Sequence, residues 1–279
     1  MASLSPALEQ LLRHPAALCN MVRRLAIEAG DHTLQYYDEA GCAAEEKPDG
    51  SPVTQADRET EAIIIKSLQD MTPGLPVVGE ESVAAGLIPD LGEAGWFWLV
   101  DAIDGTREFV RGSPDYTVNI ALIHQNAPVL GVIFAPVTGE LYAGHGPGTA
   151  IRYLADTRNE KPIRVRDLPP GGLTVVSSRN QHDPAAFDDF VAGFKIAKAL
   201  RRGSSLKMCL IAAGKADLYP RYGRTCEWDT AAGDAILRSA GGHIVDMQGA
   251  PLTYGHAERQ FCNPEFVASS GFWPVAEMD

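Results

Sequence analysis

The order of its apolar segments constrains the fold of this chain more than any other sequence feature. Apolar side chains first recur every three or four residues, which predicts amphipathic helices over about 16–38 and from Thr54 to about Thr72. Segments typical of strands and hairpins follow at Leu75–Gly79, Trp96–Val100, Val118–His124, Val129–Phe134, Leu141–Ala143 and Ala150–Tyr153. The first half is therefore predicted to be α+β, with helices followed by an antiparallel sheet.

A stretch rich in Pro and Gly, 161–172, separates this half from one in which strands and helices alternate. The expected strands are Leu173–Ser177, Ile196–Ala199, Asp217–Tyr219, Gly242–Val245 and Phe266–Ser269, and the expected helices are Pro184–Gly193, Ser204–Ala213 and Thr230–Ser239. This alternation predicts an α/β half in which helices cover a mixed sheet. We place a domain boundary near residue 165, which gives an N-terminal α+β domain, 1–165, and a C-terminal α/β domain, 166–279.

The charge and cysteine content exclude several classes of protein. The 24 Lys and Arg against 36 Asp and Glu give a net charge of −12, which argues against a nucleic-acid polymer as partner. No apolar run approaches the roughly 20 residues of a membrane span, and no secretory signal is recognisable. The five cysteines form no C-x-x-C pair, which disfavours a disulfide framework and a zinc site. We expect a cytoplasmic protein; peripheral contact with the cytoplasmic face of the inner membrane and a homodimer are left open.

Carboxylates stand directly after predicted strands or at the start of a predicted helix in three acidic segments. Glu80 follows the first strand, Asp101 and Asp104 follow the second, and Asp229 begins a helix in the other half. Strand ends can converge on one crevice, so we expect these side chains to meet. Two carboxylates three residues apart repel each other unless a cation lies between them. Hard oxygen donors without Cys or His favour magnesium.

The turn that contains Asp101 and Asp104 also has features that suit a phosphate. The carbonyl of Ile103 can serve as a neutral metal ligand, and Gly105 allows a close approach of the backbone to a ligand. If Gly105 and Thr106 begin a helical turn, their N–H groups form an anion-binding end. One hexapeptide would thus supply metal ligands and phosphate donors.

Each of these residues also has a simpler interpretation. An Asp at a strand end is often a turn former, and Asp57 and Asp229 each suit the start of a helix. Ser204 can cap a helix, while Lys207 and Arg221 can be ordinary surface charges. The combination of the acidic segments favours a metal site over these separate explanations.

Two of the segments resemble the signature motifs of the inositol monophosphatase superfamily of magnesium-dependent, lithium-sensitive phosphatases. Trp98–Thr106 is similar to Trp-x-x-Asp-Pro-(Ile/Leu)-Asp-Gly-Thr, with Ala102 in place of the usual proline, and Trp228–Gly233 is similar to Trp-Asp-x-Ala-Ala-Gly. The segments Gly79–Glu81 and Lys47–Asp57 also match in order and spacing, so the resemblance covers about 47–246. It implies a layered αβαβα sandwich. The resemblance assigns no metal ligand to position 102. The replacement of the usual proline by Ala102 therefore concerns the rigidity of the turn and not metal binding.

The resemblance implies a role for each matching position. Glu80, Asp101 and the Ile103 carbonyl would hold one magnesium ion, and Asp101, Asp104 and Asp229 a second. Asp57 and the Thr106 hydroxyl would orient the attacking water, with a third, weaker magnesium near Glu80 left open. The positions that would also contact the substrate are Glu80, Ile103, Asp104, Gly105, Thr106, Ser204, Lys207, Arg221 and Asp229.

Within the superfamily, the segments 106–109, 116–123 and 219–221 look most like the 3′(2′),5′-bisphosphate nucleotidases. Such enzymes remove the 3′-phosphate of 3′-phosphoadenosine 5′-phosphate, and Ser204, Lys207 and Arg221 would then contact the 5′-phosphate or the ribose. The alternatives are an inositol-1-monophosphatase or sugar bisphosphatase of the same superfamily. A protein that binds magnesium and nucleotide without hydrolysis is a third, less favoured alternative.

Overall fold

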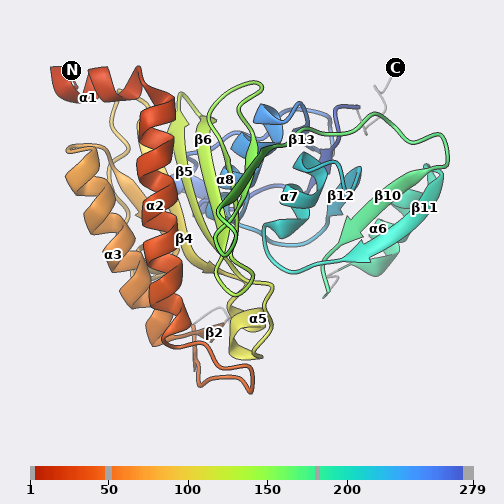
Figure 1. Cartoon of the computed structure of the whole chain (residues 1–279), viewed down its shortest axis with the longest axis horizontal. Helices are drawn as coiled ribbons and strands as arrows, with labels where there is room; N and C mark the ends of the chain where they lie inside the picture. Colours follow the sequence, from red (N-terminus) through yellow and green to blue (C-terminus); the bar gives the residue numbers. More distant parts are fainter. Residues whose placement is uncertain (1–3, 48–51, 180–182, 273–279) are drawn as a thin grey trace.

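The computed structural model describes residues 4–47, 52–179 and 183–272, arranged in five layers of helices and sheets (Figure 1). Residues 48–51 of the predicted Lys47–Asp57 segment lie outside this description. Helices α2 and α3 form the first layer, and a seven-stranded sheet forms the second. Helices α7 and α8 lie between this sheet and a five-stranded sheet, whose other face carries α6. This confirms the predicted αβαβα layering.

The helices of the first layer are amphipathic, as their sequence predicts. Helix α1 spans Pro6–Leu12, α2 spans Pro15–Leu34 and α3 spans Gln55–Met71. Helix α2 ends four residues before the predicted end at about residue 38. Helix α3 begins after Thr54, whose side chain and backbone form a capping box with Asp57, as predicted. A two-stranded sheet, β1 (Glu45–Glu46) and β2 (Pro52–Val53), lies in the connection between α2 and α3.

The first sheet has the strand order β3-β4-β5-β6-β7-β8-β9. Its strands are Val77–Gly79, Trp96–Asp104, Thr117–His124, Ala127–Ala135, Glu140–Gly144, Ile151–Leu154 and Asn159–Pro162. The pairs from β4 to β9 are antiparallel, as predicted, but β3 pairs parallel with β4, because α4 (Glu80–Ala84) and the connection after it return the chain across the sheet edge. The predicted antiparallel sheet therefore contains one parallel pair, at this edge.

Strand β4 continues beyond the predicted end at Val100 as far as Asp104. Asp101 pairs with Asn119 and Asp104 pairs with Thr117, so β4 uses three steps where β5 uses two. This mismatch is a β-bulge, which bends the strand and redirects its side chains. The acidic turn is thus a bulged continuation of the strand, and the short helix α5 (Thr106–Val110) begins directly after it.

The second sheet has the strand order β11-β10-β12-β14-β13 and is mixed, as predicted. Its strands are Leu173–Ser177 (β10), Ile196–Arg201 (β11), Leu218–Arg221 (β12), His243–Asp246 (β13) and Phe266–Ser269 (β14). The helices are α6 (Pro184–Ala192), α7 (Leu206–Ala212), α8 (Glu227–Ser239) and the 3₁₀ turn η1 (Ala257–Arg259). The predicted division near residue 165 falls between the two sheets and stays a prediction.

Helix α8 joins the two halves, because it packs against both sheets. It approaches β6 so closely that a Cβ at Gly131 would lie 2.3 Å from the carbonyl oxygen of Ala232. Apolar side chains of α8 and of the first sheet share one buried core that includes Leu99, Ile133 and Ile236. The N-terminal end of α8 is thereby fixed above β4 and β5. Among the described residues, no helix combines the length and the apolarity needed to cross a membrane.

Candidate metal and phosphate site

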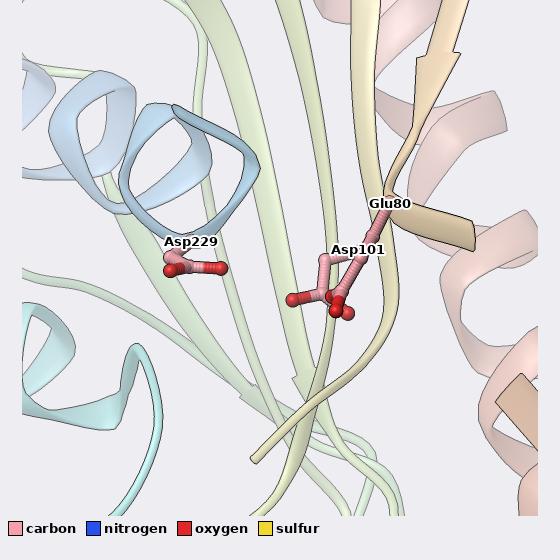
Figure 2. Close-up of side chains that lie close together, drawn as sticks. All are labelled: Glu80, Asp101 and Asp229. Atoms are coloured by element: carbon pink, nitrogen blue, oxygen red, sulfur yellow. The ribbon is translucent and has the colours of Figure 1, made fainter. Parts of the chain in front are cut away.

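Three carboxylates from distant parts of the chain meet at the end of the first sheet (Figure 2). Glu80 is the first residue of α4, Asp101 lies in β4 beside the bulge, and Asp229 is the third residue of α8. One carboxylate oxygen from each residue lies within 4.8 Å of the others. The parallel pairing of β3 with β4 brings Glu80 beside Asp101, and the packing of α8 on the sheet brings Asp229 to them.

The electrostatics of this cluster are unfavourable for three free anions. Burial raises the pKa of Asp101 well above its ordinary value, and the charges of Glu80 and Asp104 raise it further. Burial, followed by the charges of Asp104 and Glu80, also raises the pKa of Asp229 to about 8. Buried carboxylates this close to one another are stable as anions only with a cation among them. The donors are all hard oxygens, so these residues could hold a hard divalent metal ion.

Asp104 lies at the other end of the bulge and does not join this group of three. Its Oδ2 accepts hydrogen bonds from the Ser205 amide at 2.6 Å, the Ser204 hydroxyl at 2.8 Å and the Asn119 amide group at 3.3 Å. Its charge nevertheless contributes to the raised pKa values of Asp101 and Asp229, so it lies near both. The role predicted for Asp104 as a ligand of a second ion stays a prediction.

The bulge is fixed by hydrogen bonds within the turn. The Ile103 amide donates to Asp101 Oδ1 at 3.0 Å, and the Thr106 hydroxyl lies 3.2 Å from the Ile103 carbonyl oxygen. Gly105 adopts a φ of 94°, a left-handed conformation that glycine accepts without strain. Because of this conformation the chain can turn from β4 directly into α5, whose first residue is Thr106.

Asp57 lies at the N-terminus of α3 and approaches the same site from the face of the first sheet opposite to α8. Its Oδ2 accepts hydrogen bonds from the Thr54 amide at 2.7 Å and the Thr54 hydroxyl at 2.6 Å. Its Oδ1 lies 3.3 Å from the Thr106 hydroxyl oxygen. Burial raises the pKa of Asp57, although the bonds from Thr54 oppose this effect. The structure therefore brings the predicted pair Asp57 and Thr106 together beside the carboxylate cluster.

A cavity of about 150 Å³ opens beside Asp104 and Asp229, and its lining includes Lys207 and Arg221. The Lys207 ammonium group is buried, donates a hydrogen bond to the Ser204 carbonyl and lies 5.2 Å from the centre of the Tyr219 ring. Burial lowers its pKa to about 8, against the opposing effect of Asp104. The two basic residues predicted for substrate binding thus lie in one cavity with the carboxylates.

Ser204 does not cap α7, because the helix begins after Ser205 and neither hydroxyl serves as a cap. Ser204 instead adopts a φ of 56°, which is uncommon for a residue with a side chain, and its hydroxyl bonds to Asp104. The residue before it packs closely against Asp115, since a Cβ at Gly203 would lie 2.7 Å from the Asp115 carbonyl oxygen. The helix predicted to begin at Ser204 begins at Leu206.

Three charged residues in and around the site were not predicted from the sequence. The buried carboxylate of Asp115 accepts hydrogen bonds from the Gly203 amide at 3.1 Å and from Arg179 at 2.7 Å, which fixes the loop that holds Asp104. Lys47 donates to Glu80 Oε1 at 2.7 Å and to Glu81 at 2.6 Å.

The third, Glu61, accepts from the amides of Glu81 and Ser82, at 2.7 and 2.8 Å, and so fixes the start of α4. Its position four residues after Asp57, on the same face of a helix, was the one available signal. Asp115 and Lys47 lie in connections, where spacing carries no comparable information.

Comparisons with known proteins agree with this arrangement. The model of the Inositol monophosphatase family matches residues 15–270. The 3′(2′),5′-bisphosphate nucleotidase CysQ of Escherichia coli O157:H7 is 41% identical over 253 residues, which cover 90% of this chain and 99% of that protein. The protein of the same name from Salmonella typhimurium strain LT2 is 42% identical over 250 residues, covering 89% and 98%.

A crystal structure of CysQ from Bacteroides thetaiotaomicron, described as a bacterial member of the inositol monophosphatase family, is similar in fold. It superposes with a TM-score of 0.74 at 31% identity, and the match covers 92% of this chain and 98% of that one. The family model extends over both sheets and over each acidic segment of the cluster. This chain belongs to the inositol monophosphatase family.

Proposed function

We propose that this chain is a magnesium-dependent 3′(2′),5′-bisphosphate nucleotidase, which hydrolyses 3′(2′)-phosphoadenosine 5′-phosphate to AMP and phosphate. The observation that carries the proposal is the cluster of Glu80, Asp101 and Asp229 beside a cavity that contains Lys207 and Arg221. Such a substrate has one phosphate to be cleaved and a second that needs cationic partners. The activity in the names of the CysQ relatives supports the same assignment.

The proposed metal ligands are the residues of the cluster and the bulge. Glu80, Asp101 and the Ile103 carbonyl would hold one magnesium ion, and Asp101, Asp104 and Asp229 a second, with a third near Glu80 left open. Magnesium bound there would neutralise phosphoryl oxygens and lower the pKa of a water molecule. Asp101 belongs to both sets, so its carboxylate is the central ligand of the proposal.

The chain itself provides an acceptor for the proton of the attacking water. The single proton of the Thr106 hydroxyl can be donated to Asp57 Oδ1 or to the Ile103 carbonyl, at 3.3 and 3.2 Å. A Thr106 hydroxyl that donates to Asp57 presents its lone pairs to a water molecule and orients it. The raised pKa of Asp57 makes its carboxylate a better proton acceptor than an exposed Asp. Asp57 and Thr106 are therefore the proposed catalytic pair.

The proposed position of the second phosphate is the basic part of the cavity. Lys207 and Arg221 line it together with Ser204 and Gly105. Arg221 lines the cavity, and its Nε is buried without a hydrogen-bond partner among the described residues. A guanidinium group can bind a phosphate through two parallel N–H donors, which favours Arg221 as a determinant of bisphosphate specificity.

The test is a comparison of phosphate release from 3′-phosphoadenosine 5′-phosphate and from inositol 1-phosphate over a magnesium titration. We expect the bisphosphate to be clearly preferred and lithium to inhibit, because lithium would replace a weakly held magnesium without equal charge. The Arg221→Ala variant should lower kcat/KM for the bisphosphate by roughly tenfold to a hundredfold, with a much smaller effect on the monophosphate. Arg224→Ala, three residues away, is the matched control for loss of a nearby positive charge.

A preference for inositol 1-phosphate, or equal losses on both substrates in Arg221→Ala, would favour the alternative of an inositol or sugar phosphatase. Magnesium-dependent nucleotide binding without any phosphate release would favour the non-hydrolytic alternative. The cytoplasmic location stays a prediction, and the homodimer stays an open alternative.

A further inference from the structure

Two cysteines face each other beside the N-terminus of α8, in a short antiparallel bridge between Cys226 and Cys262. The amide after Cys226 donates to the carbonyl before Cys262 at 2.8 Å, and the amide after Cys262 donates to the carbonyl before Cys226 at 2.9 Å. These flanking bonds make the two cysteines a non-hydrogen-bonded pair. In such a pair the Cα atoms are about 4.5 Å apart and both side chains lie on the same face.

This placement meets the geometric requirement for a disulfide, whose Cα atoms are usually about 4.4–6.8 Å apart. Both thiols are free and only partly buried, so a small oxidant in solution can reach them. Cys19 and Cys209, by contrast, are fully buried thiols. Cys42 is partly exposed but lies near the end of α5, where its amide donates to the Val110 carbonyl. Cys226 and Cys262 are therefore the pair that the fold prepares for cross-linking.

The backbone of Cys226 directly supports the metal-site residue Asp229. The Cys226 amide donates to Asp229 Oδ2 at 2.8 Å, and the Cys226 carbonyl accepts from the Asp229 amide at 3.1 Å. The residue after Cys262 is also connected to this support, because the Asn263 side-chain amide donates to the Cys226 carbonyl at 2.7 Å. A change in the separation of the two cysteines is thus transmitted to the carboxylate of Asp229.

We propose that Cys226 and Cys262 are a site of reversible disulfide formation, and that closing this disulfide lowers the activity by displacing Asp229 from the acidic cluster. The Cβ atoms of a disulfide are about 3.8 Å apart, closer than the roughly 4.5–5.5 Å of an ordinary cross-strand pair. Closure therefore changes the spacing of Cys226 and Cys262 and moves the amide that holds Asp229. The proposal concerns the reduced and oxidised forms of the same enzyme and goes beyond the hydrolytic reaction itself.

The oxidant class is a hydroperoxide, and the step balances with hydrogen peroxide. Burial and the charge of Asp229 raise the pKa of the Cys226 thiol, so Cys262 is the first sulfur to react. Its deprotonated thiol attacks a peroxide oxygen, the O–O bond breaks, and hydroxide leaves as a sulfenic acid forms. The second sulfur then attacks the first, an S–S bond forms, and the S–O bond breaks with loss of water. Two thiols and one hydrogen peroxide give one disulfide and two waters, and two electrons pass from sulfur to oxygen. A dithiol reductant returns both thiols.

The experiment treats the full chain with hydrogen peroxide, removes the oxidant with catalase, and divides each sample before and after addition of dithiothreitol. A non-reduced digest is analysed by mass spectrometry for a peptide that links residues 226 and 262. Phosphate release is measured on the same samples over a magnesium titration. Cys262→Ser is the test variant, and Cys42→Ser is the matched control for another partly exposed thiol.

We expect the linked peptide in the oxidised wild-type protein and in Cys42→Ser, with a tenfold to hundredfold loss of activity at limiting magnesium, the usual scale for disturbing the support of a metal ligand. Dithiothreitol should restore the activity. Cys262→Ser should keep the activity of the reduced wild type and resist oxidation. Absence of the linked peptide overturns the proposal, as does a linked peptide without loss of activity, or equal sensitivity of Cys262→Ser.

Discussion

The helices α3 and α8 carry the same capping motif at their N-termini but present their aspartates to the site in different ways. On α3, Asp57 Oδ2 accepts two hydrogen bonds from Thr54, and its Oδ1 faces the Thr106 hydroxyl. On α8, Asp229 Oδ2 accepts a bond from the Cys226 amide, and the carboxylate also belongs to the cluster with Glu80 and Asp101. The two ends approach the bulge of β4 from opposite layers of the sandwich.

This difference teaches how one local motif can serve two chemical purposes. An aspartate at the third position of a helix is held rigidly by its own cap, whatever its other partners. The surroundings then decide its role: Asp57 meets a hydroxyl group, while Asp229 meets other carboxylates. The first arrangement suits proton transfer and the second suits metal binding.

The largest expected effect is at Asp101, which lies between the two helix ends. The Asp101→Asn change should reduce phosphate release by at least about 10³-fold, because it removes a central charge that both proposed ions require. Thermal unfolding of the magnesium-free protein should not show a loss of stability, since the buried carboxylate is destabilised by its neighbours. Activity within about tenfold of the wild type would contradict the proposed metal site and the different roles assigned to Asp57 and Asp229.

The two capping aspartates should then separate in a paired experiment. Asp57→Asn should lower kcat by roughly 10²- to 10⁴-fold even at saturating magnesium, because it removes the proton acceptor. Asp229→Asn should mainly raise the magnesium concentration needed for half-maximal activity. Kinetics over a magnesium titration distinguish the two effects, and magnesium binding measured by calorimetry checks them without turnover. If excess magnesium rescued Asp57→Asn but not Asp229→Asn, the assigned roles would have to be exchanged.

The smallest effect concerns pH and follows from the pKa of Asp229 near 8, against about 3.9 in the unfolded chain. Between these values the folded, metal-free protein holds a proton that the unfolded chain lacks, so its stability falls as pH rises from about 4 to about 8. Metal binding requires the deprotonated carboxylate and therefore strengthens over the same window.

Magnesium should consequently raise Tm more at about pH 8 than at about pH 6, by a few degrees. Calorimetric scans with and without magnesium at both values measure this difference, and it should shrink in Asp229→Asn. An equal magnesium effect at both pH values would mean that Asp229 does not release a proton on metal binding.

The parts of the fold and site that depend on short-range patterns were predictable from the sequence. The cap of α3 at Thr54 and Asp57 is a local motif, and the layered architecture follows from the order of helices and strands. The convergence of Glu80, Asp101 and Asp229 was also expected, because each follows a strand or begins a helix. The cap requires knowledge only of residues within a few positions of one another, whereas the cluster was expected from the placement of each carboxylate at a strand end or helix start and from recurring motifs.

Features set by distant partners were not predictable. The bulge between Asp101 and Asp104 exists because these residues pair with Asn119 and Thr117, so the register of β5 decides it. The left-handed conformation of Ser204 depends on tertiary contacts of its loop, and the contact of Lys47 with Glu80 depends on how a connection folds back. Tertiary pairing, rather than intrinsic preference, determines each of these details.

The position of α8 between the two sheets has a consequence for attempts to divide the protein. A fragment that ends near residue 165 would keep Asp57, Glu80 and Asp101 but would lose Asp229 and expose the apolar face of the first sheet. The complementary fragment would retain the helix without the surface it covers. Neither piece could assemble the proposed metal site, so catalysis by separated fragments would require their reassociation through α8.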